Sequence, residues 1–300
     1  MASLITLKRR IGSIRGTKQI TKAMQLVSAS KLRRAQEQAQ ASRAYRDAAY
    51  ELLARLNSMK EAEEESLLLE VGEQPLFRKR PVQNRLYIVM TSNSGLAGAY
   101  NANVLKLLFQ KVQRDQLDGV KSLVITIGNR GVQFVRRTVE IELVAHYPAF
   151  GDHPTQSDIQ PILTTIIDLY RHEAVDEVDV LYTLHRSGVF QEAVELPLLP
   201  ATLDNKAGVA ANTGPAMNFE PDFATVTQHI AIRLIEVQVW QALLESLASE
   251  HSMRMMAMKS ATDNASDLID DYTLEYNTAR QANITQELAE ITGGAEALKG

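Results

Sequence analysis

The chain has 300 residues, 45% hydrophobic and 23% charged, with a formal net charge of −4, a composition that suits a soluble protein of one or two domains. It contains no cysteine, which excludes disulfides, thiolate metal sites and cysteine nucleophiles. No apolar run approaches the roughly 20 residues needed to cross a bilayer, and the N-terminus lacks the form of a secretory signal, so the sequence predicts a cytoplasmic protein.

The first 60 residues are expected to form one long helix. Glycine is absent from residue 17 to residue 71 and the first proline is Pro75, so neither helix breaker interrupts most of this segment. The start of the segment follows the 3–4 spacing of a coiled-coil seam through Leu4, Leu7, Ile11 and Ile14. The seam is then expected to change phase and to continue through Ile20, Met24 and Val27 and the small residues Ala35, Ala39, Ser42 and Ala49.

The middle of the chain is expected to be an α/β domain at residues 81–215, preceded by a linker at residues 61–80 that begins with an acidic run. Apolar runs at 86–90, 123–127, 141–144 and 178–182 alternate with helical stretches at 101–116 and 159–171 and a short helix through Phe134. Continuous apolar strands favour a mostly parallel, Rossmann-like sheet that is covered on both faces. Residues 189–198 are expected to add an antiparallel edge strand.

This domain carries no pattern that predicts an enzyme. The turn at residues 92–98 lies where nucleotide-binding folds hold phosphate, but it has neither Gly-x-Gly-x-x-Gly nor a Walker loop. We interpret it, and the turn at residues 128–131, as backbone turns that need glycine for their shape. The histidines of the region lack the spacing of a metal site: His146, His153, His172 and His185. The sequence therefore predicts no catalytic, cofactor-binding or metal-binding residue.

A second long helix is expected at residues 220–298, because residues 222–292 contain neither proline nor glycine. At about 1.5 Å per residue it would extend on the order of 110 Å. Most positions at 3–4 spacing from Phe223 are apolar or small, as in a coiled-coil seam. The seam is predicted to consist of Phe223, Val226, Ile230, Val237, Trp240, Leu244, Leu247, Met258, Ala261, Ala265, Leu268, Tyr272, Ala279, Ala282 and Ala289.

The two terminal helices carry opposite charges. Residues 1–60 contain thirteen Lys or Arg and three Asp or Glu, whereas residues 220–300 contain five and thirteen. Each exposed ion pair contributes only ~0–1 kcal/mol, but complementary charge helps to orient paired helices. The expected fold is thus an antiparallel coiled coil plus the α/β domain, with the last ~20 residues of the C-terminal helix projecting beyond its partner. We expect no nucleic-acid partner, because the acidic helix is the internal partner of the basic one.

Long ungapped motifs at both ends resemble the gamma-subunit family of F-type ATP synthases. They are residues 11–31 (IGSIRGTKQITKAMQLVSASK), 249–258 (SEHSMRMMAM), 261–265 (ATDNA) and 276–288 (YNTARQANITQEL). The resemblance covers the full length and is weakest from about residue 130 to residue 215. It implies a non-catalytic rotor in a bacterial enzyme that couples proton flow to ATP synthesis.

The resemblance also implies the partners. The coiled coil would penetrate a hexamer of alternating alpha and beta subunits, and its base would sit with the epsilon subunit on a ring of c subunits. The chain would be peripheral to the cytoplasmic face of the bacterial cell membrane and not inserted in it, and it would hold no cofactor. Nucleotide chemistry would take place in the beta subunits.

Several residues match family positions that contact partners. Arg280, Gln281 and Thr285 match positions that contact a catch loop of a beta subunit. Lys18, Lys22 and Met24 match the region that faces an acidic lever segment of that subunit, and Arg254 belongs to the Met-Arg-Met motif with either a packing or a partner role.

The sequence departs from the family in the turn at residues 92–98, where Asn93 and Ser94 replace an acidic and a basic residue. That change puts any ion pair from the turn in doubt. The alternative to a rotor is a coiled-coil adaptor or scaffold with an α/β head and no rotary role. A catalytic protein is the third hypothesis, and it predicts nucleotide hydrolysis by the isolated chain.

Overall fold

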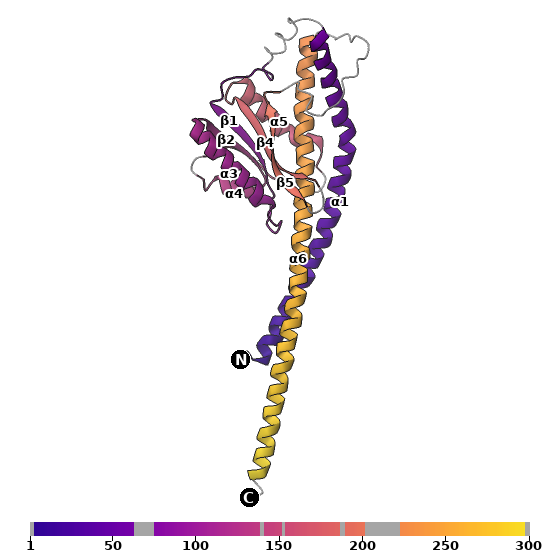
Figure 1. Cartoon of the computed structure of the whole chain (residues 1–300), viewed down its shortest axis with the longest axis vertical. Coiled ribbons are helices and arrows are strands. Elements are labelled where there is room, and N and C mark those ends of the chain that lie inside the picture. Colours follow the sequence, from indigo (N-terminus) through magenta and orange to yellow (C-terminus); the bar gives the residue numbers. More distant parts are fainter. Residues whose placement is uncertain are drawn as a thin grey trace. The chain divides into compact units, whose positions relative to one another are not determined.

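A computed structural model describes residues 3–62, 75–138, 141–151, 154–186, 190–201 and 223–297 (Figure 1). The chain divides into two compact units, one of Met1–Ala29 with Arg254–Gly300 and one of Ser30–Met253. Two long helices, α1 (Leu4–Ala62) and α6 (Phe223–Ala297), contribute residues to both units. Most of the predicted linker, His153 and the side chain of Ala49 lie outside the described part of the chain, and the division at residues 60, 81, 215 and 220 stays a prediction.

The middle of the chain forms a five-stranded sheet. Its strands are β1 (Asn84–Met90), β2 (Lys121–Ile127), β3 (Glu142–Tyr147), β4 (Glu177–His185) and β5 (Gln191–Leu199). They lie in the order β3-β2-β1-β4-β5, with the first four parallel and β5 antiparallel to β4 at the edge. The apolar runs and the edge strand predicted from the sequence are confirmed, because both faces of the central strands are buried.

Helices α3 (Tyr100–Asp118), α4 (Asn129–Val135) and α5 (Gln156–Arg171) cover this sheet (Figure 1). Helices α3 and α4 pack on one face, where Val104 and Leu108 of α3 meet Tyr87 and Val89 of β1. Helix α5 begins where the Asp158 carboxylate accepts a hydrogen bond of 2.7 Å from the Thr155 amide, and it buries six apolar side chains. Helices α3, α4 and α5 together flank a sheet that is buried on both sides, as a Rossmann-like fold requires.

A buried charged cluster joins β1, β4 and α3 on the α3 side of the sheet. The Arg85 guanidinium pairs with Asp115, whose carboxylate is fully buried, and donates to Glu177 at 2.7 Å. The Tyr87 hydroxyl donates to Asp115 at 2.7 Å, and burial together with this bond raises the pKa of Tyr87. A second hydroxyl, that of Ser122, donates to the same carboxylate at 3.0 Å. The buried charge of Asp115 is therefore paired and hydrogen-bonded, which is the condition for tolerating it.

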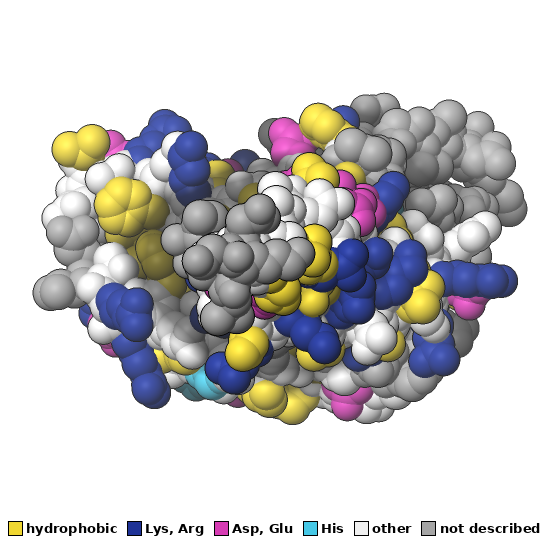
Figure 2. Space-filling view, turned by 90° about the horizontal axis from the view of Figure 1, so that it is seen from below, with side chains coloured by type: hydrophobic (Ala, Val, Ile, Leu, Met, Phe, Trp, Pro, Cys, Tyr) yellow, Lys and Arg dark blue, Asp and Glu magenta, His cyan; other side chains and the backbone are white. Residues whose placement is uncertain are grey.

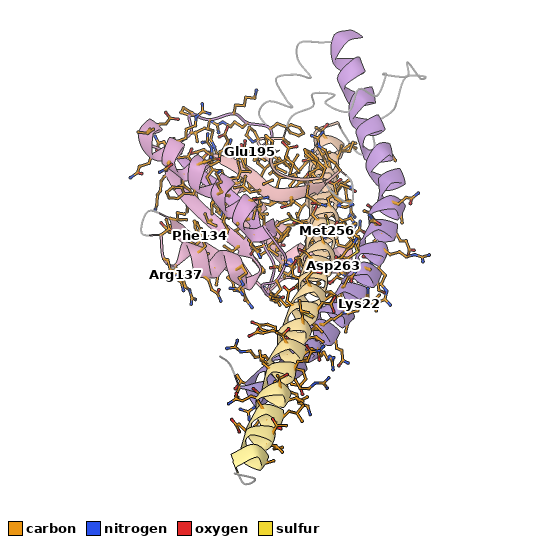
Figure 3. All side chains as sticks on the ribbon, turned by 60° about the horizontal axis from the view of Figure 1, so that its bottom comes forward. Lys22, Phe134, Arg137, Glu195, Met256 and Asp263 are labelled. Atoms are coloured by element: carbon orange, nitrogen blue, oxygen red, sulfur yellow. The ribbon has the colours of Figure 1, made fainter. Side chains whose placement is uncertain are left out.

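Asp179 on β4 is the less well-compensated carboxylate of this cluster. It is 6% exposed, and Arg85 Nε lies 3.7 Å from it. Burial, and then the charges of Glu195 and Glu177, raise the pKa of Asp179 to about 7, against the opposing influence of Arg85 and Lys111. Lys111 itself is paired with Glu195 of β5, which is labelled in Figure 3. The ionised form of Asp179 is thus penalised in the folded state.

The raised pKa of Asp179 predicts a stability that falls as the pH rises. Between the ordinary aspartate pKa of 3.8 and the folded-state pKa of about 7, the folded protein holds a proton that the unfolded chain has released. The stabilisation is therefore full below this range and is lost as the pH rises through the folded pKa. A difference of this size corresponds to about 4 kcal/mol. The Asp179→Asn variant should unfold with a free energy about 1–3 kcal/mol higher than wild type at pH 8, and its stability should depend less on pH.

The measurement is urea unfolding followed by the fluorescence of Trp240, the single tryptophan, which lies buried on α6. Asp118→Asn is the matched control, because Asp118 sits at the exposed end of α3. Equal pH dependence of wild type and Asp179→Asn would contradict the assignment.

Candidate functional site: the helical shaft

The two long helices run antiparallel within each of the two compact units. The Thr262 hydroxyl donates to the Thr21 hydroxyl at 2.8 Å, and the Arg10 guanidinium lies 5.9 Å from the centre of the Tyr272 ring. In the other unit the Ser42 hydroxyl donates to Gln241 at 3.1 Å. The residue numbers add up to 283 and 282 for the two pairs of the first unit and to 283 for the pair of the second, so the helices pair antiparallel within each unit.

The predicted change of phase in the α1 seam is wrong. Ile20 and Val27 are 63% and 54% exposed, whereas their neighbours Thr21 and Ser28 are buried. The seam keeps one heptad phase through Leu7, Ile11, Thr21, Ser28, Leu32 and Ala35. The Thr21 hydroxyl in this seam is hydrogen-bonded to Thr262 of the partner helix, a bond that an apolar side chain could not make.

The predicted α6 seam is buried as expected at Val237, Trp240, Leu244 and Leu247, and is only partly correct beyond them. Met258 and Ala265 are buried as expected, and Tyr272 is half-buried. The alternate positions are one residue out, since Thr262 is buried while Leu268 is 45% exposed. The errors in the α1 and α6 seams have one cause. The prediction assumed that apolar side chains lie between the helices, but on this shaft Ile20, Val27 and Leu268 are exposed.

The last part of α6 has no partner helix among the described residues. The register places Leu4, the first residue of α1, opposite Ala279. Every residue from Gln281 to Ala295 is exposed although the segment is helical. Ile284, Leu288 and Ile291 are 47%, 58% and 67% exposed and recur at intervals of four and three, so they form one apolar stripe on this free end.

Three residues with predicted partner contacts lie at the start of this free end. Arg280 and Gln281 are exposed, and the Thr285 hydroxyl, also on the surface, donates to the Gln281 carbonyl at 2.9 Å. Because Thr285 is one turn from Gln281, these two side chains lie on one surface of the helix, and Arg280 lies about 100° around the helix from Gln281.

The other predicted contact residues differ in their exposure. Lys22 is exposed and donates to Gln25 at 3.3 Å, while Lys18 and Met24 are half-buried beside the seam. Figure 3 labels Lys22 on α1 and Asp263 on α6. Arg254 is only 9% exposed, so it belongs to the packed part of the shaft.

Basic side chains cover the outer surface of the first turns of α1. Lys8, Arg9 and Arg15 are exposed, and no described carboxylate lies within ion-pairing distance of them. Figure 2, which looks onto the end of the shaft, shows Lys and Arg side chains gathered beside it. The opposite charges predicted for the two helices therefore do not meet in direct ion pairs at these residues, and this basic surface remains open to a partner.

The turn after β1 is closed by its own side chains. The Ser92 hydroxyl donates to the Ser94 carbonyl at 2.6 Å, and Asn93 Oδ1 accepts hydrogen bonds from the amides of Ala149 at 3.0 Å and Asn129 at 3.3 Å. A Cβ on Gly128 would lie 2.1 Å from the Thr91 carbonyl oxygen, so glycine is required there, as the sequence predicted. Asn93 thus joins three loops at the carboxyl ends of the parallel strands through hydrogen bonds to main-chain groups.

Neither a metal site nor a membrane-spanning helix is found among the described residues. No three His, Asp or Glu side chains in this part of the chain come together in a way that would hold a metal ion. None of the described helices has a stretch that is both long and apolar enough to span a membrane.

The fold and the exposed shaft define a coiled-coil stalk protein that works through surfaces offered to partners. The family model described as ATP synthase matches residues 3–298. The ATP synthase gamma chain of Moorella thermoacetica is 36% identical over 299 residues, covering all of both chains. The chain therefore belongs to the gamma-chain family of ATP synthases. It is a non-catalytic subunit of the central rotor stalk, and catalysis resides in the beta subunits.

Solved structures agree on the fold. The chain matches a chain of the rotor of the Euglena gracilis mitochondrial ATP synthase with a TM-score of 0.62 and 14% identity, covering 94% of this chain and 98% of that one. A chain in a second structure of that enzyme, of its OSCP, F1 and c-ring, gives a TM-score of 0.65 and 16% identity, covering 98% and 94%. The central stalk and c-ring structure from Tetrahymena thermophila gives 0.58 and 20%, covering 81% and 99%.

The corrected seam predicts a large loss of stability for one substitution and almost none for its neighbour. Ser28→Arg places a long cation in the closely packed seam and should lower the free energy of unfolding of the shaft by about 2 kcal/mol or more. Val27→Arg changes an exposed position and should alter it by no more than about 0.5 kcal/mol. Thermal unfolding followed by circular dichroism measures both, and a larger loss for Val27→Arg would restore the seam predicted from the sequence.

Proposed function

We propose that the chain turns inside a ring of alternating alpha and beta subunits, with its base on the epsilon subunit and a ring of c subunits. Proton flow through the c ring drives this rotation, and the enzyme lies at the cytoplasmic face of a bacterial cell membrane. The observation that supports the proposal is the free end of α6, which is helical from Gln281 to Ala295 although all of its residues are exposed. A single helix of this kind with an apolar stripe gains most of its stability from packing, so a surrounding sleeve of subunits fits it.

The asymmetry of the shaft suggests how rotation would change the catalytic sites. At the level of Arg10 and Lys18 the shaft has a basic helix and an acidic one, whereas beyond Arg280 a single helix remains. Each beta subunit would therefore meet a different surface at each rotary position. A subunit that binds one of these surfaces best in one conformation is shifted towards that conformation, and its affinity for nucleotide changes with it.

The predicted contact residues have separate proposed roles. Arg280, Gln281 and Thr285 would bind a catch loop of a beta subunit, since Arg280 can pair with carboxylates through its planar guanidinium. Lys18 and Lys22 would face an acidic lever segment of that subunit. Arg254 would act from inside the shaft, by fixing the packing of α6 rather than by a direct contact.

Substitutions at the proposed contacts should weaken coupling. Arg280→Ala removes the donor that would grip the catch loop, and Met24→Lys adds a cation that would hold the acidic lever too tightly to release. Each variant should lower the ATP-driven proton pumping of the complete enzyme in vesicles relative to wild type.

Arg114→Ala is the matched control, because Arg114 is an exposed cation on α3, away from the proposed contacts. If both shaft variants pumped protons as well as wild type and the control, the contact assignment would be wrong.

Site-specific cross-linking separates a rotor from a coiled-coil adaptor. The chain has no cysteine, so Arg280→Cys introduces a single reactive thiol at an exposed position. With a short cross-linker, a rotor should form a bond to one beta subunit per complex and so stop ATP hydrolysis, and reduction of a cleavable linker should restore it. An adaptor predicts either no beta cross-link or continued hydrolysis after cross-linking.

A further inference from the structure

Helix α6 meets the α/β domain through a row of buried serines. Ser246, Ser249 and Ser252 are 2%, 0% and 0% exposed, all within the unit Ser30–Met253. Alanine or glycine would fill the same narrow space without a polar group to satisfy. The hydroxyls therefore have to be explained by what they contact.

Each serine is hydrogen-bonded to a different element of the α/β domain. The Ser246 hydroxyl lies 2.6 Å from the Tyr100 hydroxyl at the start of α3. The Ser249 hydroxyl donates to the Thr183 carbonyl of β4 at 2.9 Å. The Gln191 amide, at the start of β5, donates to the Ser252 hydroxyl at 3.1 Å. The domain thus holds one stretch of α6 from three directions.

Because of the spacing of the serines, their hydrogen bonds oppose both rotation and sliding of α6 against the α/β domain. Positions three and six residues apart on a helix are separated by about 4.5 and 9 Å along the axis and by about 60° and 120° around it. Apolar contacts tolerate small rotations because they are not directional, whereas a hydrogen bond weakens steeply as its angle and length change. A helix held at three heights and three angles can neither roll nor slide without breaking bonds between buried groups.

A fourth polar contact lies further along the same helix. The Gln160 amide of α5 donates to Glu236 at 3.1 Å, and Glu236 is 4% exposed and also accepts from Arg233 at 2.6 Å. The attachment of α6 therefore depends on directional bonds along much of its contact with the domain.

We propose that Ser246, Ser249 and Ser252 form a rotational key that locks α6 to the α/β domain, so that torque passes between the two without slip. The inference rests on the proposed rotary function and names the positioning residues for it. The serines touch neither nucleotide nor any catalytic subunit, and they act only through the fixed orientation of α6.

The test uses the complete enzyme with the triple variant Ser246→Ala, Ser249→Ala and Ser252→Ala. Ser260→Ala is the control, because Ser260 is an exposed serine on the same helix. In vesicles the triple variant should pump several-fold fewer protons per ATP hydrolysed than wild type. ATP hydrolysis by the catalytic subunits with the chain, without the membrane ring, should be unchanged, since no torque then passes through the α/β domain. Ser260→Ala should match wild type in both assays.

A pair of isosteric variants separates the key from a general packing role. Ser249→Thr and Ser249→Val add the same bulk, but only threonine keeps the hydroxyl that reaches the Thr183 carbonyl. If the serines act as this key, Ser249→Thr should keep the number of protons pumped per ATP hydrolysed and Ser249→Val should lower it. This comparison can be made even if the triple variant fails to assemble. Equal numbers of protons pumped per ATP by Ser249→Thr and Ser249→Val would contradict the role of the serines but not the rotary function. Absence of pumping with the wild-type chain would contradict both proposals.

Discussion

The antiparallel pairing of α1 and α6 through a partly polar seam is the constraint on which the shaft depends. Small or hydroxyl side chains are buried in this seam, namely Thr21, Ser28, Thr262 and Ala265. The hydrogen bond between Thr21 and Thr262 then fixes the register, which a purely apolar seam would specify less strictly. This register places the start of α1 at Leu4 opposite Ala279, and so determines the length of α6 that has no helical partner among the described residues.

Because the seam between α1 and α6 is partly polar, many apolar side chains lie on the outer surface of the shaft. Ile5, Ile20, Leu26 and Val27 of α1 are all more than half exposed, as are Leu274, Leu288 and Ile291 of α6. For a monomer in water such surfaces are a liability, but for a shaft enclosed by other subunits they are the contact surface. The exposed cations of the first turns of α1 add charge to the same surface. The chain is thus built to be surrounded, which agrees with its membership of the gamma-chain family.

The sequence predicted the elements well because each has a local cause. The absence of proline and glycine marked α1 and α6, and continuous apolar runs marked the strands of the buried sheet. Two features depended on tertiary contacts and were missed. The phase of the seam depends on which side chains meet the partner helix and not on their hydrophobicity, so Ser28 is buried and Val27 is not. The cluster of Arg85, Asp115 and Asp179 joins residues from two strands and a helix, and no local pattern marks them as neighbours.

Rotation of the chain within the ring is the central claim, and single-molecule microscopy tests it most directly. Leu117 on α3 is 88% exposed, so Leu117→Cys offers one attachment point for an optical probe on a chain without cysteine. With the alpha and beta subunits fixed to a surface, addition of ATP should make the probe turn continuously in one direction. A probe that stays at one angle while the complex hydrolyses ATP would contradict the account.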